Sequence, residues 1–132
     1  MTRWSSKKII EWYSAQEWLI GSNFLPSTAI NQLEMFQTET FDEKTIRKEL
    51  GLAKSLGFNS MRVYLHDLLW DIKDEFLINF EKFLSICEEK NIKPIIVLFD
   101  DCHRANPKLC LLYTSDAADE NEGVGLGGGG GG

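Results

Sequence analysis

The feature that most constrains the fold is a nearly continuous apolar run at residues 94–99, Pro-Ile-Ile-Val-Leu-Phe, which ends at Asp100 and Asp101. A strand with one wet face alternates apolar and polar residues, whereas an unbroken apolar run indicates a strand buried on both faces, as in parallel sheets. Residues 18–24 and 60–66 also have strand composition, and Pro26 follows the first of them. The sequence therefore predicts three parallel strands.

Two long helical patterns separate these strands. The first begins between Thr40 and Asp42, either of which could cap it, and ends at Gly57. The second is capped by Asp71 or Asp74 and ends at Asn91. Helical spacing gives the first helix one apolar stripe and the second a wide apolar face, made respectively by Ile46, Leu50, Ala53 and Leu56, and by Phe76, Leu77, Phe80, Phe83, Leu84 and Cys87.

Two shorter helices are expected nearer the N-terminus. Ser5 or Ser6 can cap a helix that runs to about Ala15, with Ile9, Ile10 and Tyr13 on its apolar side. Residues 31–35 form a brief helical stretch within a long loop. The alternation of strands and helices, with short connections from helix to strand, is typical of α/β proteins.

The pattern alone does not separate a (β/α)₈ barrel from a doubly wound sheet. The turn after the first strand lacks the spacing Gly-x-Gly-x-x-Gly, so nothing there supports a dinucleotide or phosphate site, and no cofactor is predicted. The three cysteines show neither metal-type nor redox-pair spacing, so no metal site is predicted.

Glycine is distributed very unevenly, with eight of the eleven glycines in residues 123–132. Residues 110–120, Cys-Leu-Leu-Tyr-Thr-Ser-Asp-Ala-Ala-Asp-Glu, resemble a transposon-based sequencing adapter translated in one frame, and the glycine run resembles translated poly-G. A flexible glycine linker is the alternative, and neither carries packed structure. The chain therefore divides into residues 1–109, a portion of a folded domain, and residues 110–132, a non-native, disordered Gly-rich tail.

The charge of the folded portion is close to neutral. All 14 basic residues precede residue 110 while four of the 20 acidic residues follow it, so residues 1–109 carry a net charge of −2. This value argues against nucleic acid or a membrane surface as the main partner and is compatible with a neutral substrate. The first residues lack an apolar run long enough for a signal peptide or a membrane span, which favours a cytoplasmic protein. The oligomeric state is not determined by the sequence.

Candidate binding residues lie where the strands end, because ligands of parallel α/β folds bind at the carboxyl ends of the strands. Asn23 follows the first strand, Arg62 and His66 lie on the second, and Asp100 follows the third. An arginine in a buried strand needs an acceptor, so Arg62 either tunes a catalytic carboxylate or forms a structural ion pair. His66 and Asp100 either shape a ligand subsite or are hydrogen-bonded structural residues, and Trp70 either stacks on a ligand or packs in the core.

Several segments resemble a known family. Residues 56–63, Leu-Gly-Phe-Asn-Ser-Met-Arg-Val, are similar to the segment that leads into the second strand of family-five cellulases and their relatives. Residues 23–35, 62–70 and 97–100 resemble the N-terminal part of proteins described as cellulase-family glycosyl hydrolase or 1,4-β-xylanase. The resemblance covers residues 3–109 and weakens after Asp100, where the family pattern has a small residue, a cysteine and an aromatic instead of Asp101, Cys102 and His103.

The resemblance implies a partial (β/α)₈ TIM barrel, its first three βα units only, from a retaining glycoside hydrolase that cleaves β-glycosidic bonds in xylan-like or cellulose-like carbohydrates. Such enzymes use an acid/base glutamate and a nucleophile glutamate about 5 Å apart. No residue of this chain matches either glutamate, so the fragment is expected to be inactive, and its two open sheet edges to make it unstable alone.

The same resemblance implies roles for the candidate residues. Arg62 matches the strand-two arginine that supports the nucleophile, and Asn23, His66, Trp70 and Asp100 match positions that line or support the substrate pocket. Two alternatives stay open: a carbohydrate-binding barrel without catalysis, and a different barrel enzyme acting on sugars, such as an isomerase or aldolase.

Overall fold

The structure is a computed structural model that describes residues 3–100. Within them, a parallel sheet in the order β1-β2-β3 is formed by β1 (Gly21–Asn23), β2 (Ser60–Tyr64) and β3 (Lys93–Val97). The three predicted parallel strands are confirmed, although each is shorter than the pattern predicted.

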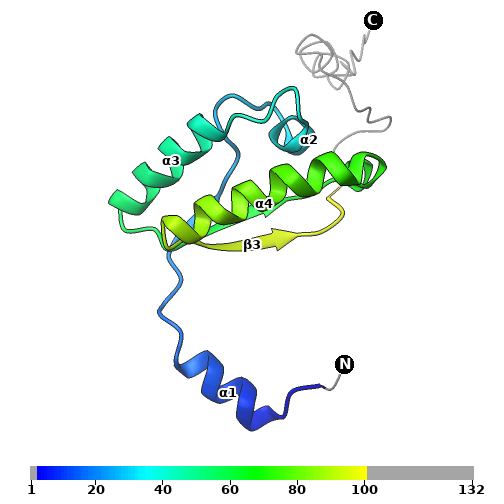
Figure 1. Cartoon of the computed structure of the whole chain (residues 1–132). Coiled ribbons are helices and arrows are strands. Elements are labelled where there is room, and N and C mark those ends of the chain that lie inside the picture. The colour runs from blue at the N-terminus through cyan, green and yellow to red at the C-terminus, as the bar shows by residue number, and fades with distance from the viewer. Residues whose placement is uncertain (1–2, 101–132) are drawn as a thin grey trace, which may run out of the picture.

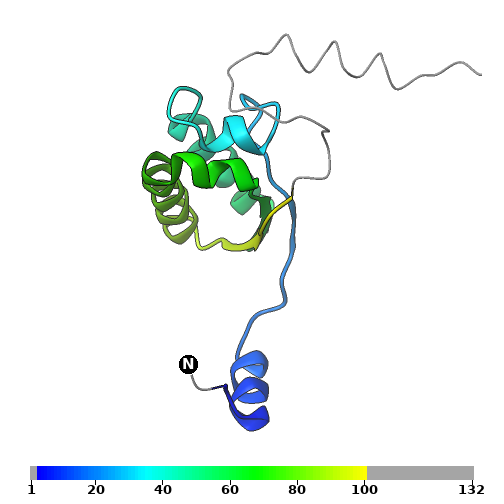
Figure 2. The same cartoon turned by 90° about the vertical axis from the view of Figure 1, so that its right-hand side faces the viewer.

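Helices cover one face of this sheet. They are α2 (Gln32–Phe36), α3 (Glu43–Ser55) and α4 (Lys73–Glu89), and a 3₁₀ helix, η1 (Asp67–Ile72), connects β2 to α4. Figures 1 and 2 show α2, α3 and α4 gathered on the same side of the strands. Arg47 of α3 pairs with Glu89 of α4, which joins the two long helices at the surface.

The expected partial (β/α)₈ barrel is wrong. In the described residues four α-helices accompany a small open sheet, in which β1 and β3 each pair with β2 alone. Closing a sheet into a barrel needs tilted, staggered strands around a full circle, and three strands do not make that circle. Periodicity predicts each strand and helix, whereas closure depends on pairing between distant strands. The predicted tail, residues 110–132, lies outside the described residues.

Local signals placed most helix ends correctly. The Ser5 hydroxyl accepts from Lys8 N at 3.3 Å to cap α1 (Ser6–Ser14). At α3 the cap is Asp42, whose Oδ1 accepts from Thr45 N at 3.0 Å. The left-handed residues predicted after the long helices are also present, with φ of 93° at Gly57 and 52° at Asn91. These ends follow from residues within one turn of each other.

The predicted cap of α4 is wrong. Neither Asp71 nor Asp74 caps this helix, which begins at Lys73 after Ile72 without a side-chain hydrogen bond. The chain enters α4 directly from η1, whose N-cap position is occupied by His66. A continuous entry from one helix to another removes the free N-terminal turn that an aspartate would cap.

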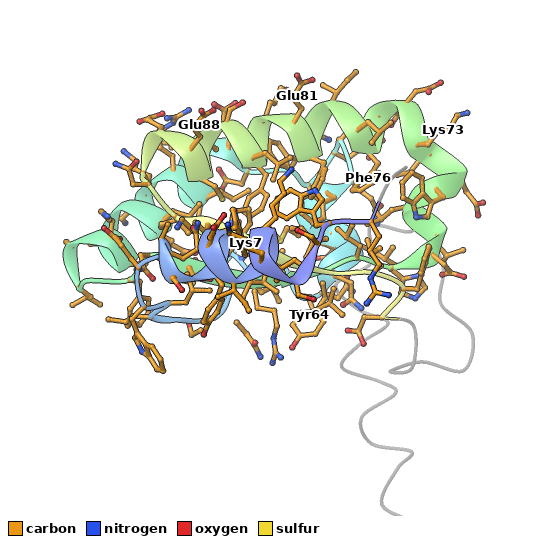
Figure 3. All side chains as sticks on the ribbon, turned by 90° about the horizontal axis from the view of Figure 1, so that it is seen from below. Lys7, Tyr64, Lys73, Phe76, Glu81 and Glu88 are labelled. Atoms are coloured by element: carbon orange, nitrogen blue, oxygen red, sulfur yellow. The ribbon has the colours of Figure 1, made fainter. Side chains whose placement is uncertain are left out.

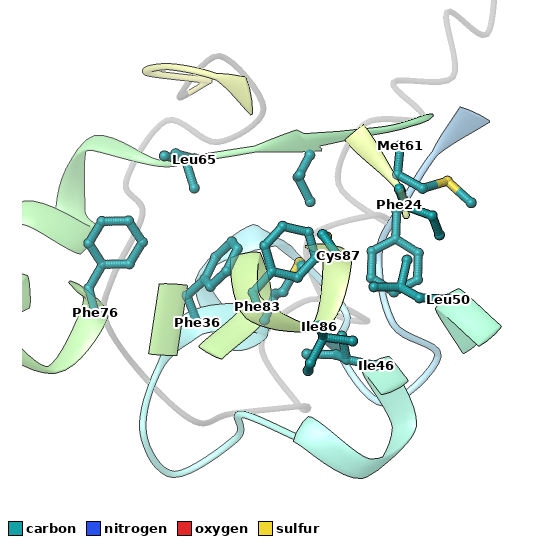
Figure 4. Close-up of a cluster of buried hydrophobic side chains, with 14 of the residues drawn as sticks. Phe24, Phe36, Ile46, Leu50, Met61, Leu65, Phe76, Phe83, Ile86 and Cys87 are labelled. Carbon is teal, nitrogen blue, oxygen red and sulfur yellow. The ribbon is translucent and has the colours of Figure 1, made fainter. Parts of the chain in front are cut away.

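The core lies between the sheet and the three covering helices and centres on Phe36, which is fully buried. Its ring meets Phe76, Phe80 and Phe83 edge-on, with centroids 5.7, 5.7 and 5.8 Å away. Figure 4 shows Met61 and Leu65 of the β2 segment facing these helices across the core. Aromatic pairs in this geometry add to the stabilisation from burial.

The second face of the sheet is uncovered in the described residues, contrary to the expected burial on both faces. Met61, Val63 and Leu65 point into the core, whereas Arg62 is exposed and Ile95, its neighbour on β3, is 46% exposed. A continuous apolar run indicates that a strand is compatible with burial on both faces. It does not supply the element that would cover the second face.

Some residues of the predicted apolar faces are also exposed. Leu56 lies beyond the end of α3 and is 76% exposed, and Leu77 and Leu84 face outward from α4. Figure 3 shows Phe76 pointing inward from α4, while Glu81 and Glu88 point away from the molecule. The buried stripe of α4 is therefore narrower than its sequence suggested.

The first helix stands apart from the other elements in both views (Figures 1 and 2). It buries no residue, and Ile9, Ile10 and Tyr13 of its apolar side are exposed. Trp4 and Trp12 form a local edge-on pair with centroids 6.4 Å apart. Across the described part of the chain, no helix has the length and apolar character needed to cross a lipid bilayer.

Candidate functional site

A polar cluster lies on the uncovered face of the sheet, where β1 and β2 end. The register places Asn23 beside Arg62, and Arg62 Nε donates to Asn23 Oδ1 at 2.8 Å. The same oxygen accepts from the Tyr64 hydroxyl at 3.4 Å. The guanidinium of Arg62 lies over the Tyr64 ring, 5.3 Å from its centroid. We call Asn23, Arg62 and Tyr64 the strand-end cluster.

The pairing of Arg62 differs from the sequence-based expectation. Arg62 was expected in a strand buried on both faces and paired with a carboxylate. It is instead exposed, and among residues 3–100 no acidic side chain lies within ion-pair distance of it. A side-chain amide oxygen accepts one of its five N–H groups, so the guanidinium keeps most of its donors for other acceptors.

A groove of about 840 Å³ opens beside this cluster. Its walls come from the ends of β1 and β2, from the loop and helix that follow β1, and from the segment after β3. Among the described residues it is lined by Asn23, Phe24, Leu25, Ile30, Asn31, Gln32, Met35, Tyr64 and Asp100. Apolar walls with a few polar groups are typical of small-ligand sites.

The backbone of Asp100 is held at the groove by two hydrogen bonds. Its N–H donates to Leu65 O at 2.8 Å, and its carbonyl oxygen accepts from Gln32 Nε2 at 2.8 Å. Asp100 is the only acidic residue among the described residues that line the groove. Asn23 and Asp100, two of the predicted binding residues, therefore line one groove, and Arg62 bonds to Asn23.

His66 lies elsewhere and is buried. Its Nδ1 is 2.6 Å from Asp67 Oδ1, and that contact requires a proton between the two atoms, so Nδ1 donates to the carboxylate. The N–H of Leu68 therefore donates to Asp67 Oδ1, at 2.7 Å, rather than to His66 Nδ1, which is 3.2 Å away. His66 and Asp67 together start η1, and His66 does not line the groove.

Trp70 is also outside the groove. It lies on η1, is 43% exposed, and packs edge-on against Phe76 with centroids 5.6 Å apart. One part of its ring thus contributes to packing over α4 and another part faces solvent. Asp101, Cys102 and His103, where the resemblance weakens, lie outside the described residues.

Sequence reasoning missed Tyr64 and Gln32. Tyr64 had a usable signal, because residues two apart on a strand share a face and Tyr64 is two residues after Arg62. Gln32 had none, since its partner is 68 residues away and the contact exists only after folding.

The site shows no arrangement for a metal ion. Among residues 3–100, no three His, Cys, Asp or Glu side chains come together in a way that could hold one. Among the described residues, the available chemistry is that of hydrogen bonds, one guanidinium, two aromatic rings and one carboxylate.

Comparison of the chain with protein-family models, with curated proteins and with solved structures returns no match. A functional assignment thus rests on the residues and the geometry of the groove.

Proposed function

We propose that the groove binds a β-linked oligosaccharide, and that the chain is part of a glycoside hydrolase acting on xylan-like or cellulose-like carbohydrate. The observation that carries the proposal is the strand-end cluster, Asn23, Arg62 and Tyr64, at the lip of the groove. Sugar hydroxyls each donate and accept hydrogen bonds, and a cluster of an amide, a guanidinium and a phenol offers both functions.

The walls of the groove support the same ligand class. Sugar rings have apolar C–H faces between their hydroxyl groups, and Phe24, Leu25 and Met35 provide apolar lining between the polar residues. The resemblance of residues 23–35 and 62–70 to glycosyl hydrolases points to the same class, and these two segments contribute most of the lining.

Binding without cleavage is expected of this chain. Retaining hydrolysis needs two carboxyl groups about 5 Å apart, one protonated and one ionised. The described lining of the groove contains one carboxylate, Asp100, and Glu34 is buried where its Oε2 accepts from Ile30 N at 3.0 Å. We therefore assign the chain a role in holding substrate, with the catalytic glutamates contributed by residues that this chain does not contain.

The test is a titration of the full chain with xylohexaose and with cellohexaose. Binding is measured by isothermal calorimetry and by amide chemical shifts. We expect saturable binding of one of them, with shifts concentrated at residues 23–35, 62–64 and 100. Asn23→Ala and Tyr64→Ala should each weaken binding by about 2-fold to 12-fold, the equivalent of one lost hydrogen bond.

Glu81→Gln is the matched control, because Glu81 points away from the molecule on the outer side of α4 (Figure 3). Its affinity should equal that of the unchanged chain. A folded chain that binds neither oligosaccharide would overturn the proposal. Hydrolysis is tested separately on a protein in which residues 1–109 continue into their natural downstream sequence, which should release reducing sugar from xylan or carboxymethylcellulose.

A further inference from the structure

Two hydrogen bonds hold the backbone of Asp100, one to the residue after β2 and one from α2. Its N–H donates to the carbonyl oxygen of Leu65, directly after β2. Its own carbonyl oxygen accepts from the side chain of Gln32, the first residue of α2. Both distances are 2.8 Å, within the range of well-formed hydrogen bonds.

The chain reaches this position through an unfavourable backbone conformation. Phe99 has φ of 58°, in the left-handed region that side chains other than glycine rarely occupy. Its side chain is 58% exposed, so burial of the ring provides little compensation. Such residues persist where surrounding interactions determine the conformation, and the two hydrogen bonds of Asp100 are the interactions that follow Phe99 directly.

Gln32 is presented from an anchored element. The side chain of Asn31 caps α2 by accepting from Leu33 N and Glu34 N, each at 3.0 Å. At the other end of α2, the buried amide of Asn79 donates to Phe36 O at 3.0 Å and ties the helix to α4. Because α2 is held at both ends by these contacts, the position of Gln32 does not depend on its hydrogen bond to Asp100 alone.

We propose that Gln32 is a positioning residue that sets where the Asp100 carboxylate stands in the groove, and so tunes how tightly the groove binds a sugar. It acts through the Asp100 backbone, whose placement determines which sugar hydroxyl the carboxylate can reach. The inference rests on the proposed function for its ligand, while the positioning itself is a property of the free protein.

The test uses Gln32→Glu, which keeps the shape of the side chain and replaces the donor with an acceptor facing the Asp100 carbonyl oxygen. Hydrogen exchange of the Asp100 amide in the ligand-free chain should accelerate by about 10-fold, because its bond to Leu65 O opens more often once the other hydrogen bond is lost. Gln32→Leu, which removes the donor without adding charge, should have the same effect. Unchanged exchange in both folded variants would overturn the proposal, whether or not a sugar binds.

Xylohexaose affinity provides the second readout. When Asp100 is present, Gln32→Glu should weaken xylohexaose binding by about 5-fold, a loss comparable to one hydrogen bond. In an Asp100→Ala background the same substitution should change affinity by less than about 2-fold, because no carboxylate remains to be misplaced. An equal loss in both backgrounds would mean that Gln32 contacts the sugar directly and would overturn its positioning role.

Gln16→Glu is the control for added charge, since Gln16 bonds to Lys93 outside the groove. It should leave both the exchange of Asp100 and the affinity unchanged. If the unchanged chain binds neither xylohexaose nor cellohexaose, the proposed function fails, while the exchange measurement still decides whether Gln32 positions Asp100.

Discussion

The side-chain amide of Asn79 donates a hydrogen bond to the backbone carbonyl of Phe36 across 3.0 Å, with both residues buried. This bond joins the middle of α4 to the end of α2, the helix that carries Gln32. A buried carbonyl that loses its donor keeps its desolvation penalty, which makes this one contact important for the placement of the groove wall.

Asn79→Ala should therefore lower the free energy of unfolding by about 1–3 kcal/mol. The measurement is the urea midpoint of the full chain by circular dichroism. Ser85→Ala on the same helix is the control, because the Ser85 hydroxyl donates within its own helix, to Glu81 O, on an exposed surface. Equal effects of the two substitutions would show that the Asn79 bond contributes nothing specific.

The Phe36 ring is the centre of the core, so Phe36→Ala should cost about 3–5 kcal/mol through lost burial and a residual cavity. That loss is comparable with the whole stability of a small domain, and we expect the variant to be largely unfolded at 25 °C. Leu77→Ala, at a residue 46% exposed on α4, should cost far less. Retention of native near-ultraviolet dichroism by Phe36→Ala would contradict this account of the core.

Two glycines should respond in opposite directions to the same substitution. A Cβ at Gly21 would lie 1.9 Å from the backbone oxygen of Ser60, so Gly21→Ala must push β1 and β2 apart. A Cβ at Gly51, inside α3, meets only the end of the Lys90 side chain at 3.9 Å. Gly51→Ala should stabilise the chain by about 0.5–1 kcal/mol, while Gly21→Ala should destabilise it by about 2 kcal/mol or more.

Both substitutions are compared by their urea midpoints, and the Gly21→Ala variant also by amide shifts across β1 and β2. A stabilising Gly21→Ala would mean that the close approach of these strands is not maintained in solution.

The cap of α3 makes stability depend on pH in the acidic range. Hydrogen bonds from the Thr45 hydroxyl and backbone lower the pKa of Asp42 below its usual value of 3.8. Because the folded-state pKa is the lower one, the contribution of Asp42 is present above pH 3.8 and is lost as pH falls through the folded-state value.

Asp42→Ala should cost about 0.5–2 kcal/mol at pH 7, and the difference from the unchanged chain should shrink below pH 3.8. Thermal unfolding at several pH values measures both. If the stability difference between Asp42→Ala and the unchanged chain stays constant from pH 7 to pH 2.5, the effect does not come from the charged cap.

Burial raises the pKa of the Cys87 thiol from 9.0 to about 12. The thiol should be unreactive toward Ellman's reagent at pH 8 in the native chain and reactive in urea, because the nucleophile is the thiolate. Cys102→Ser and Cys110→Ser together leave Cys87 as the only thiol for this measurement.

The same shift has a consequence for stability at high pH. The folded-state pKa is the higher one, so the contribution of Cys87 is complete below pH 9 and is lost as pH rises toward 12. A Cys87→Ala variant should lack this alkaline loss of stability. Rapid native labelling of Cys87 at pH 8 would show that the core around α4 opens readily.

The sequence by itself determined the local structure of this protein. The caps at Ser5 and Asp42 and the left-handed Gly57 and Asn91 each depend on residues that are near neighbours in the chain, as do the positions of the three strands. Hydrogen bonding within a turn and the period of apolar residues are enough to specify such features.

Tertiary structure decided what the sequence left open. Which sheet face is covered, how Arg62 finds Asn23 and Tyr64, and how Gln32 reaches Asp100 all depend on strand register and on segments 39 to 68 residues apart. No local pattern encodes these distances, because each is the result of packing one element against another. The open sheet found in place of the expected partial barrel has the same cause. Strand periodicity indicates that a segment forms a strand, whereas the number of strands that pair with it is decided by the folded chain.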